Sequence, residues 1–198
     1  AVFEESILSA NPIPTAADLD LCGYNFNAWP ALSTTGTTPS HMKFVYMVDS
    51  DPEINSAIAG FTSGAYNLTT RTRINGLGEN GISFINTGNA EGNPGYPGMK
   101  LGGAILAINT EGKEELSVKW TGRTLALGVR QYAIRLQYRI GDIVDFADLL
   151  DENNQLIEYN RGNAAGDSAV LEVKLPATLL NQPYVQLLWR YYRKSGTS

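Results

Sequence analysis

The side chains best suited to chemistry in this chain are Arg, Gln, Lys and Tyr residues that recur at every second position. Arg and Gln carry planar, directional hydrogen-bond donors that can grip paired sugar hydroxyls or a uronate carboxylate. A Tyr ring can stack on a sugar while its hydroxyl forms a hydrogen bond. The candidate ligand-binding residues of this polar row are Lys119, Arg135, Gln137, Arg139, Gln186, Arg190 and Tyr192.

The spacing of the polar row predicts the elements that carry it. Apolar and polar residues alternate with a period of two in 116–121, 132–140 and 184–192. This period is typical of strands that turn one face to a core and the other face to water. If the three strands are neighbours, their wet faces form a flat bed of planar donors and positive charge. Such a surface suits a sugar chain better than it suits catalysis.

The same polar row also has an interpretation without a ligand. On a solvated sheet face, Arg and Lys prevent aggregation and pair across strands with acidic residues such as Glu172. The order of the strands decides whether the row is one continuous surface, and the sequence does not give that order.

Aromatic residues beside turns offer a second kind of binding surface. Tyr24, Trp29, Tyr66 and Tyr96 lie next to turn residues, where an exposed ring would be a stacking platform. Trp29 and Tyr96 are therefore further candidate ligand-binding residues. In the alternative interpretation these rings close the open ends of the fold. Trp120 and Trp189 fall in the apolar rows, and we expect them in the core.

Acidic residues gather in two places and suggest a calcium site. Asp49, Asp51 and Glu53 are the candidate metal ligands, because calcium takes about six to eight oxygens from such loops. A second acidic cluster follows the Arg-rich strand and comprises Asp142, Asp145, Asp148, Asp151, Glu152 and Asn154. Neither cluster has the Asp-x-Asp-x-Asp-Gly spacing of an EF-hand loop. The alternative is helix capping by Asp51 and solvated turns elsewhere.

Signals for catalysis are weak, and we expect a non-catalytic protein. His41 is the sole histidine, and the chain has no Gly-x-Ser-x-Gly elbow. One enzymatic alternative is a jelly-roll polysaccharide lyase, in which Arg135 and Arg139, with Gln137 between them on the same face, neutralise a uronate. Tyr192 or His41 would then remove the proton. This alternative is a fold-level analogy.

The remaining pattern predicts the fold class. Further strands are expected at 42–48, 71–74, 81–87, 101–109 and 168–175. One short helix is expected at 51–60, with Asp51 as its N-cap and Pro52 at its first position. Many short strands joined by Gly-rich turns predict an all-β protein, specifically a two-sheet antiparallel β-sandwich of jelly-roll type.

Length and composition bound the organisation and the partners. A chain of 198 residues with 43% hydrophobic residues fits a single module over 1–198. We expect 1–20 to be an opening strand and an irregular lead-in, and 194–198 to be a tail or linker. A net charge of −5 without a basic block argues against nucleic acid. No apolar run approaches a length of about 18 residues, so no membrane insertion is expected. Cys22 is the single cysteine, so no disulfide forms within the chain.

Five segments carry a resemblance to a known kind of module. They are Thr72–Gly88, Ala107–Gly112, Val118–Gly122, Ile134–Arg139 and Asn181–Tyr192. Together they resemble a β-sandwich module of large secreted surface proteins of Bacteroidota, and the likeness covers about residues 20–194. The resemblance implies a secreted or cell-surface location within a larger multidomain protein, and a broad similarity to carbohydrate-binding modules. It implies no particular functional residue.

Taken together, these patterns predict an extracellular carbohydrate-binding module that recognises a polysaccharide on a polar and aromatic sheet face or in a loop cleft. The basic residues of the polar row favour an acidic glycan slightly. The alternative is a structural or adhesive spacer domain of a large surface protein, without a small ligand. In a binding module, exposed rings should lie beside unpaired Arg or Gln. In a spacer, the same residues should be paired with one another.

Overall fold

The computed structural model describes residues 13–19, 23–26, 28–29, 39–47, 62–63, 74–85 and 101–195. Within these ranges the chain forms twelve strands and a single turn of 3-10 helix, η1, at Ala177–Leu179. The predicted all-β class is therefore confirmed. The opening strand predicted in 1–20 and the helix predicted at 51–60 lie outside the described residues, apart from the short stretch 13–19. No helix in the described ranges is long and apolar enough to cross a membrane.

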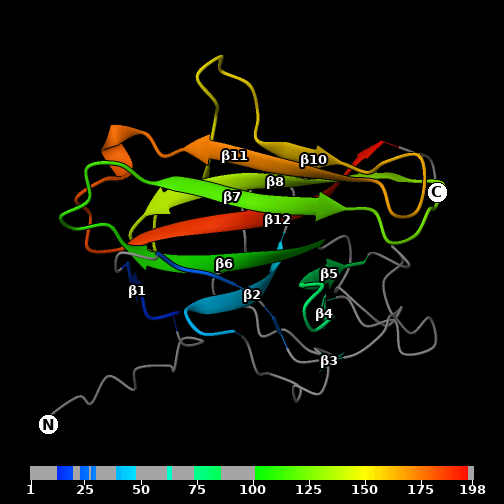
Figure 1. Cartoon of the computed structure of the whole chain (residues 1–198), viewed down its shortest axis with the longest axis horizontal. Coiled ribbons are helices and arrows are strands. Elements are labelled where there is room, and N and C mark those ends of the chain that lie inside the picture. The colour runs from blue at the N-terminus through cyan, green and yellow to red at the C-terminus, as the bar shows by residue number, and fades with distance from the viewer. Residues whose placement is uncertain are drawn as a thin grey trace, which may run out of the picture.

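The largest described sheet has seven strands (Figure 1). Its main path runs through β1 (Ala17–Asp18), β6 (Leu101–Asn109), β12 (Val185–Ser195), β8 (Gln131–Ile140) and β10 (Glu158–Asn160). Beside this path, β2 (Met42–Met47) pairs with β6, and β9 (Ala147–Asp148) pairs with β8. Neighbouring strands are antiparallel except β1 and β6. Since β12 extends to Ser195, the tail expected from residue 194 begins inside a strand.

Two smaller sheets complete the described part of the chain. β7 (Ser117–Arg123) and β11 (Ser168–Lys174) form an antiparallel pair. β3 (Thr62–Ser63), β4 (Ile74–Gly76) and β5 (Ile82–Phe84) form a three-stranded sheet in which β4 and β5 are antiparallel.

One face of the seven-stranded sheet and the β7–β11 pair share a hydrophobic core. Leu136 and Leu187 from the large sheet are buried in the same cluster as Val173 from β11. Trp120 and Trp189 are partly buried and pack against this cluster, as their apolar spacing predicts. The alternation of apolar and polar residues explains why these apolar side chains gather in one core, because directly opposed residues on neighbouring strands point to the same face.

Trp29 is part of this core. Its ring lies edge-on to Phe44 with 5.2 Å between ring centroids, and a Cβ atom at Gly76 would approach the indole within 2.5 Å. Two backbone hydrogen bonds with Gly78 hold Trp29 in place. The prediction that Trp29 is an exposed stacking ring was wrong, because this backbone pairing turns a loop residue inward over the sheet.

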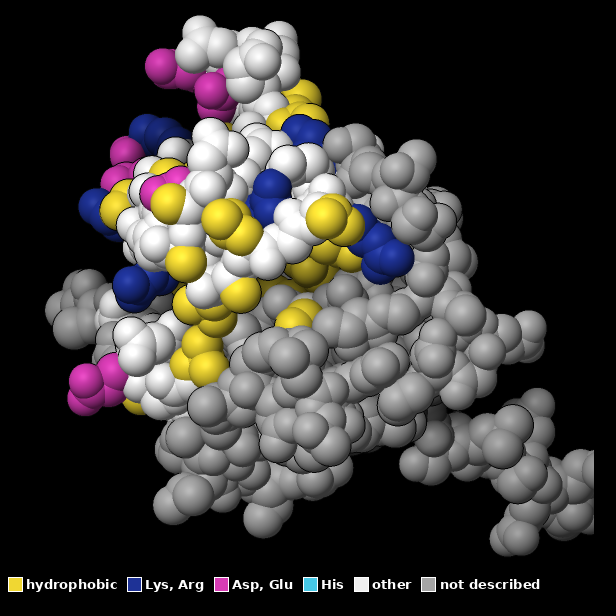
Figure 2. Space-filling model, turned by 90° about the vertical axis from the view of Figure 1, so that its right-hand side faces the viewer, with side chains coloured by type: hydrophobic (Ala, Val, Ile, Leu, Met, Phe, Trp, Pro, Cys, Tyr) yellow, Lys and Arg dark blue, Asp and Glu magenta, His cyan; other side chains and the backbone are white. Residues whose placement is uncertain are grey.

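The loops between the long strands gather at the two ends of the molecule, because the strands run lengthwise in Figure 1. The β7–β8 loop, 124–130, follows the end of β7 at the right-hand end of that view. Figure 2 looks onto this end and shows hydrophobic side chains among Lys and Arg side chains, with Asp and Glu side chains toward the left-hand rim and the top of the view. The β8–β9 loop, 141–146, lies at the opposite end of β8.

Candidate functional site

Six of the seven residues of the predicted polar row lie on one face of the large sheet. β8 and β12 are neighbours, with Gln186 opposite Arg139 and Arg190 opposite Arg135. Leu187 and Leu136 point to the shared core, so these polar residues point to the other side. We call this side the polar face, and its members are Arg135, Gln137, Arg139, Gln186, Arg190 and Tyr192.

Lys119 does not belong to the polar face. It lies on β7, which pairs with β11 in a separate sheet. Its Nζ is 3.1 Å from Oε2 of Glu172, the residue directly opposite, and both side chains are exposed. The prediction that Lys119 shares a surface with Arg135 was wrong, because alternation alone does not assign a strand to a sheet. The cross-strand pairing with Glu172 that the alternative interpretation predicted is present.

Much of the polar face is buried. Gln137, Arg139, Gln186 and Arg190 are between 1% and 8% exposed, so the prediction of a wet face was wrong for these four residues. A small apolar cluster of Ile105, Phe146 and Leu188 lies on the same side of the sheet. The physical reason for the error is that a buried polar row alternates with apolar residues just as an exposed polar row does.

Arg139 is held by a chain of hydrogen bonds. Its Nε donates to Oε1 of Gln186 at 2.8 Å, and its Nη1 donates to the carbonyl of Val144 at 3.0 Å. The Nε2 of Gln186 donates to the hydroxyl of Tyr184, which in turn donates to the carbonyl of Pro14 at 2.6 Å. The guanidinium also lies over the ring of Phe146. A buried charge is tolerated only when it is bonded in this way.

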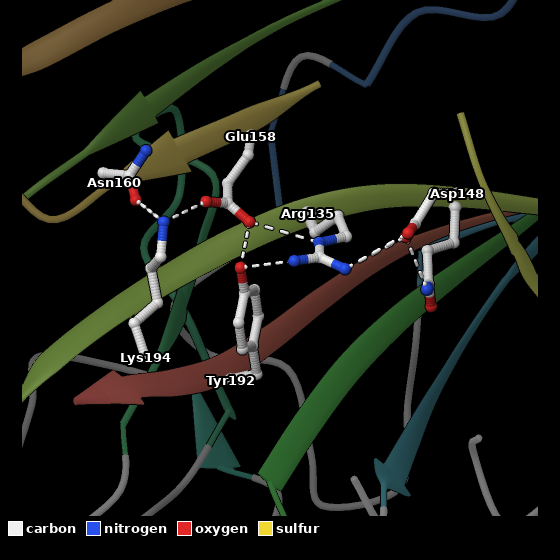
Figure 3. Close-up of polar contacts among 7 residues, drawn as sticks. Arg135, Asp148, Glu158, Asn160, Tyr192 and Lys194 are labelled. Carbon is white, nitrogen blue, oxygen red and sulfur yellow. Dashed lines mark hydrogen bonds and ion pairs between the residues drawn. The ribbon is translucent and has the colours of Figure 1, made fainter. Parts of the chain in front are cut away.

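Arg135 is the centre of a second set of bonds (Figure 3). Its Nε donates to Oε2 of Glu158 at 3.1 Å, and its Nη1 donates to the carboxylate of Asp148 at 3.2 Å. Its Nη2 donates to the hydroxyl of Tyr192 at 2.8 Å, and the guanidinium lies 4.8 Å from the centroid of that ring. Each of the three guanidinium nitrogens thus donates to an acceptor from β9, β10 or β12.

Further residues extend this set on both sides. The Nζ of Lys194 donates to Oε1 of Glu158 at 2.7 Å and to Oδ1 of Asn160 at 2.6 Å. Gln137 donates to Asp148, and Tyr192 donates to Glu158. We call the whole set the Arg135 network, comprising Arg135, Gln137, Asp148, Glu158, Asn160, Tyr192 and Lys194.

The electrostatics of the Arg135 network are balanced. Burial alone would raise the pKa of Glu158, but hydrogen bonds from Lys194, Tyr192 and Arg135 outweigh it and lower that pKa below its ordinary value. Burial and the hydrogen bond donated to Glu158 raise the pKa of Tyr192 to about 12. At neutral pH two cations, Arg135 and Lys194, therefore face two anions, Asp148 and Glu158, around a neutral phenol.

The calcium hypothesis concerns residues that are mostly outside the described part of the chain. Asp49, Asp51 and Glu53 lie outside it, as do the aromatic candidates Tyr66 and Tyr96. In the acidic cluster after β8, which is described, Asp148 faces Arg135 rather than other acids. Within the described ranges, no group of three or more His, Cys, Asp and Glu side chains converges as a metal site.

His41 and the polar face do not come together as a lyase-like constellation. His41 precedes β2, and its Nδ1 lies 2.9 Å from the carbonyl of Thr15. Two strands, β6 and β12, separate β2 from β8. At a strand spacing of about 4.8 Å, roughly 14 Å separate the backbones of His41 and Arg139. Tyr192 lies six residues further along β12 than Gln186, the residue opposite Arg139.

The sequence analysis did not place four of the seven members of the Arg135 network beside Arg135, namely Asp148, Glu158, Asn160 and Lys194. Asp148, Glu158 and Asn160 come from β9 and β10, which are two and three residues long and were not predicted. A signal for β10 was present, because Ile157 and Tyr159 are buried and alternate with Glu158 and Asn160. Comparison with protein-family models, curated proteins and solved structures found no match.

Proposed function

We propose that this chain is a non-catalytic β-sandwich module that acts as a structural or adhesive spacer in a large secreted or cell-surface protein. The observation that carries the proposal is the pairing of the side chains best suited to grip a ligand. Arg135 is bonded to Asp148, Glu158 and Tyr192, and Arg139 is bonded to Gln186. This is the arrangement expected of a spacer rather than of a binding surface.

The sandwich architecture is part of the proposal. It is supported by the core that the seven-stranded sheet shares with the β7–β11 pair. A module with its apolar rows buried between two layers and its polar face internally bonded has the stiffness that a spacer needs.

The energetics of the Arg135 network favour the spacer role over ligand binding. A hydrogen bond to a charged group contributes about 1.5–3 kcal/mol to stability. A sugar that recruited Arg135 would have to replace its bonds to the carboxylates of Asp148 and Glu158 with bonds to neutral hydroxyls. The attraction between opposite charges would be lost, and both carboxylates would be left without this partner. The exchange would therefore cost more than it returns.

The test is to remove Arg139, which the spacer role makes a structural residue. We expect Arg139→Ala to lower the free energy of unfolding by about 3 kcal/mol, because it leaves Gln186 without its buried partner and opens space beside Phe146. Lys119→Ala is the matched control, and its exposed pair with Glu172 should contribute less than about 1 kcal/mol. Urea denaturation measures both. An unchanged stability in Arg139→Ala would contradict the proposal.

Polysaccharide binding is the second candidate, and we assign it to the exposed rim of the Arg135 network. Asn160 and Lys194 are exposed there, and Asp148 and Arg135 are half-buried. Amide, ammonium and carboxylate groups are all suitable partners for sugar hydroxyls. A glycan array and affinity gels should include neutral and acidic polysaccharides, with and without calcium. Retention that Asn160→Ala abolishes without a loss of stability would establish this candidate and reject the spacer role.

A further inference from the structure

The two ends of β8 carry loops with exposed apolar side chains and charges of opposite sign. The β7–β8 loop, 124–130, precedes β8, and the β8–β9 loop, 141–146, follows it. β8 has ten residues, so its ends are about 33 Å apart. The loops therefore lie at opposite ends of the molecule, as Figure 1 shows for the strands that they join.

The first end is apolar and basic. Leu125, Leu127 and Val129 are 50%, 52% and 89% exposed, which is unusual for three aliphatic residues in one loop. Arg123 and Arg130 flank them in the sequence, and Figure 2 shows hydrophobic and basic side chains together at this end. We call this surface the basic tip, comprising Arg123, Leu125, Leu127, Val129, Arg130 and Arg161.

Hydrogen bonds fix the backbone conformation of the loops that form the basic tip. Arg161 donates from Nη1 to the carbonyl of Gly128 and from Nε to Oε1 of Gln131. Asp167, the acid of the adjoining β10–β11 loop, is occupied by the backbone N–H groups of Asn163 and Ala164. The loop thus presents its aliphatic side chains on a fixed backbone, and its charge is positive.

The second end is apolar and acidic. Ile143 is 84% exposed, and Ile140 and Val144 beside it are exposed as well. Asp142 and Asp145 alternate with them along the chain. The β6–β7 loop reaches the same end and adds Glu111 and Glu114, while Lys113 is the single cation of 110–115. We call this surface the acidic tip, comprising Glu111, Glu114, Ile140, Asp142, Ile143, Val144 and Asp145.

We propose that the basic tip of one copy of this chain docks on the acidic tip of a second copy, so that copies associate end to end. Each tip offers three exposed aliphatic residues for burial, and the charges around them are complementary. The two surfaces differ, so each docked pair leaves one basic tip and one acidic tip free, to which further copies can add. The inference rests on the proposed spacer function and names its partner.

The strength of the association follows from the size of the tips. Contacts made by so few loops bury less than the roughly 1,200 Å² of a stable interface, so the association should be weak and transient. We expect a dissociation constant on the order of 100 μM, which falls in the range of weak encounters. Because the charges are exposed, raising the salt concentration should weaken it further.

Sedimentation velocity of the full chain from about 10 μM to 1 mM tests the proposal, in 50 mM and in 500 mM salt. The weight-average sedimentation coefficient of the unchanged protein should rise with concentration, and less so at high salt. Val129→Asp and Ile143→Arg should each weaken association at least tenfold. Val170→Asp is the matched control, because Val170 is 63% exposed on β11 outside both tips, and it should associate like the unchanged protein.

Mixing the two tip variants gives the decisive outcome. Val129→Asp keeps its acidic tip and Ile143→Arg keeps its basic tip, so the mixture should form one-to-one dimers and nothing longer. Failure of the mixture to associate would overturn the end-to-end contact, as would equal loss in Val170→Asp.

Two further outcomes separate this inference from the proposed function. A protein that is monomeric at all concentrations and binds no glycan overturns the association and leaves the spacer role standing. Retention on a glycan array overturns the spacer role on which the inference rests, whatever the sedimentation result. If the monomeric protein binds phosphatidylserine vesicles and Val129→Asp does not, the basic tip belongs to a membrane surface, and the proposal is wrong.

Discussion

Glu158 is a charged residue that stabilises the fold from a buried position on β10, the last strand of the main path of the large sheet. Only 5% of its side chain is exposed, yet it accepts hydrogen bonds from Arg135, Tyr192 and Lys194. Neutralising Glu158 would leave the cations Arg135 and Lys194 beside an uncharged group. Removing one partner of a buried ion pair strongly destabilises a protein, because the remaining charge is left uncompensated. The residue is therefore a sensitive probe of the Arg135 network.

Replacing Glu158 by Gln should lower the free energy of unfolding at pH 7 by about 2–3 kcal/mol, because Gln keeps the shape of the side chain but not its charge. Glu172→Gln is the matched control on the exposed β11 surface, where the loss should stay below about 1 kcal/mol. Urea denaturation of both variants measures the difference. Equal losses would mean that the Arg135 network contributes no more than a surface ion pair.

The difference in stability between the unchanged protein and Glu158→Gln should depend on pH, in a direction that the pKa of Glu158 fixes. The folded-state pKa of Glu158 is lowered, so the stability it contributes is present above the unfolded pKa of about 4.3 and is lost as the pH falls through the folded-state pKa. The gap between the unchanged protein and Glu158→Gln should therefore narrow below about pH 4. Denaturation curves from pH 7 to pH 3 follow it. A constant gap would show that the charge of Glu158 is not what stabilises the fold.

At the scale of the elements, the alternation of apolar and polar residues predicted the positions of the long strands well, but it did not predict which of their faces are buried. β6 has the predicted bounds, and β8, β11 and β12 lie within a few residues of theirs. Alternation is a local property, so it can be read along the chain. Burial of Arg139 and Trp29 depends on what folds over each side of the sheet, which no local pattern contains.

The contact between the two layers can be tested at one glycine. A Cβ atom at Gly122 on β7 would lie 2.2 Å from Cγ of Tyr159 on β10, so the small residue is needed for the layers to approach. Gly122→Ala should lower the free energy of unfolding by about 1–3 kcal/mol through overpacking.

Gly128→Ala is the control for that substitution, because nothing lies within 4 Å of a Cβ atom there. Its effect should stay within about 0.5 kcal/mol. Thermal melts of both variants give the comparison. A stable Gly122→Ala protein would mean that β7 and β10 do not pack through this contact.

At the scale of the whole molecule, the candidate site could be predicted in part. The alternation predicted that six polar residues share one face if β8 and β12 are neighbours, and the structure shows that they are. It misassigned Lys119 and did not identify Asp148 and Glu158 as partners of Arg135, because sheet membership and strands of two or three residues are decided by contacts distant in sequence. The partners of Arg135 are therefore visible only in the structure, and their pairing favours the spacer role over ligand binding.

The position of β12 predicts how stability is distributed. β12 is hydrogen-bonded to β6 on one side and β8 on the other, and Val185, Leu187 and Leu188 are buried. Its amides should exchange with solvent roughly 100-fold more slowly than those of β11, which has a single partner strand among the described residues. Hydrogen exchange with mass spectrometry measures this. Equal rates would show that both sheets open as one unit.

The order of the strands also has a consequence during synthesis. β12 lies between β6 and β8, yet it follows both of them in the chain. Until the ribosome has released β12, β6 and β8 each expose an unpaired edge that can join another nascent chain. The central strand β12 can pair with β6 and β8 along its whole length only after translation has passed residue 195, so the large sheet folds late and relatively slowly.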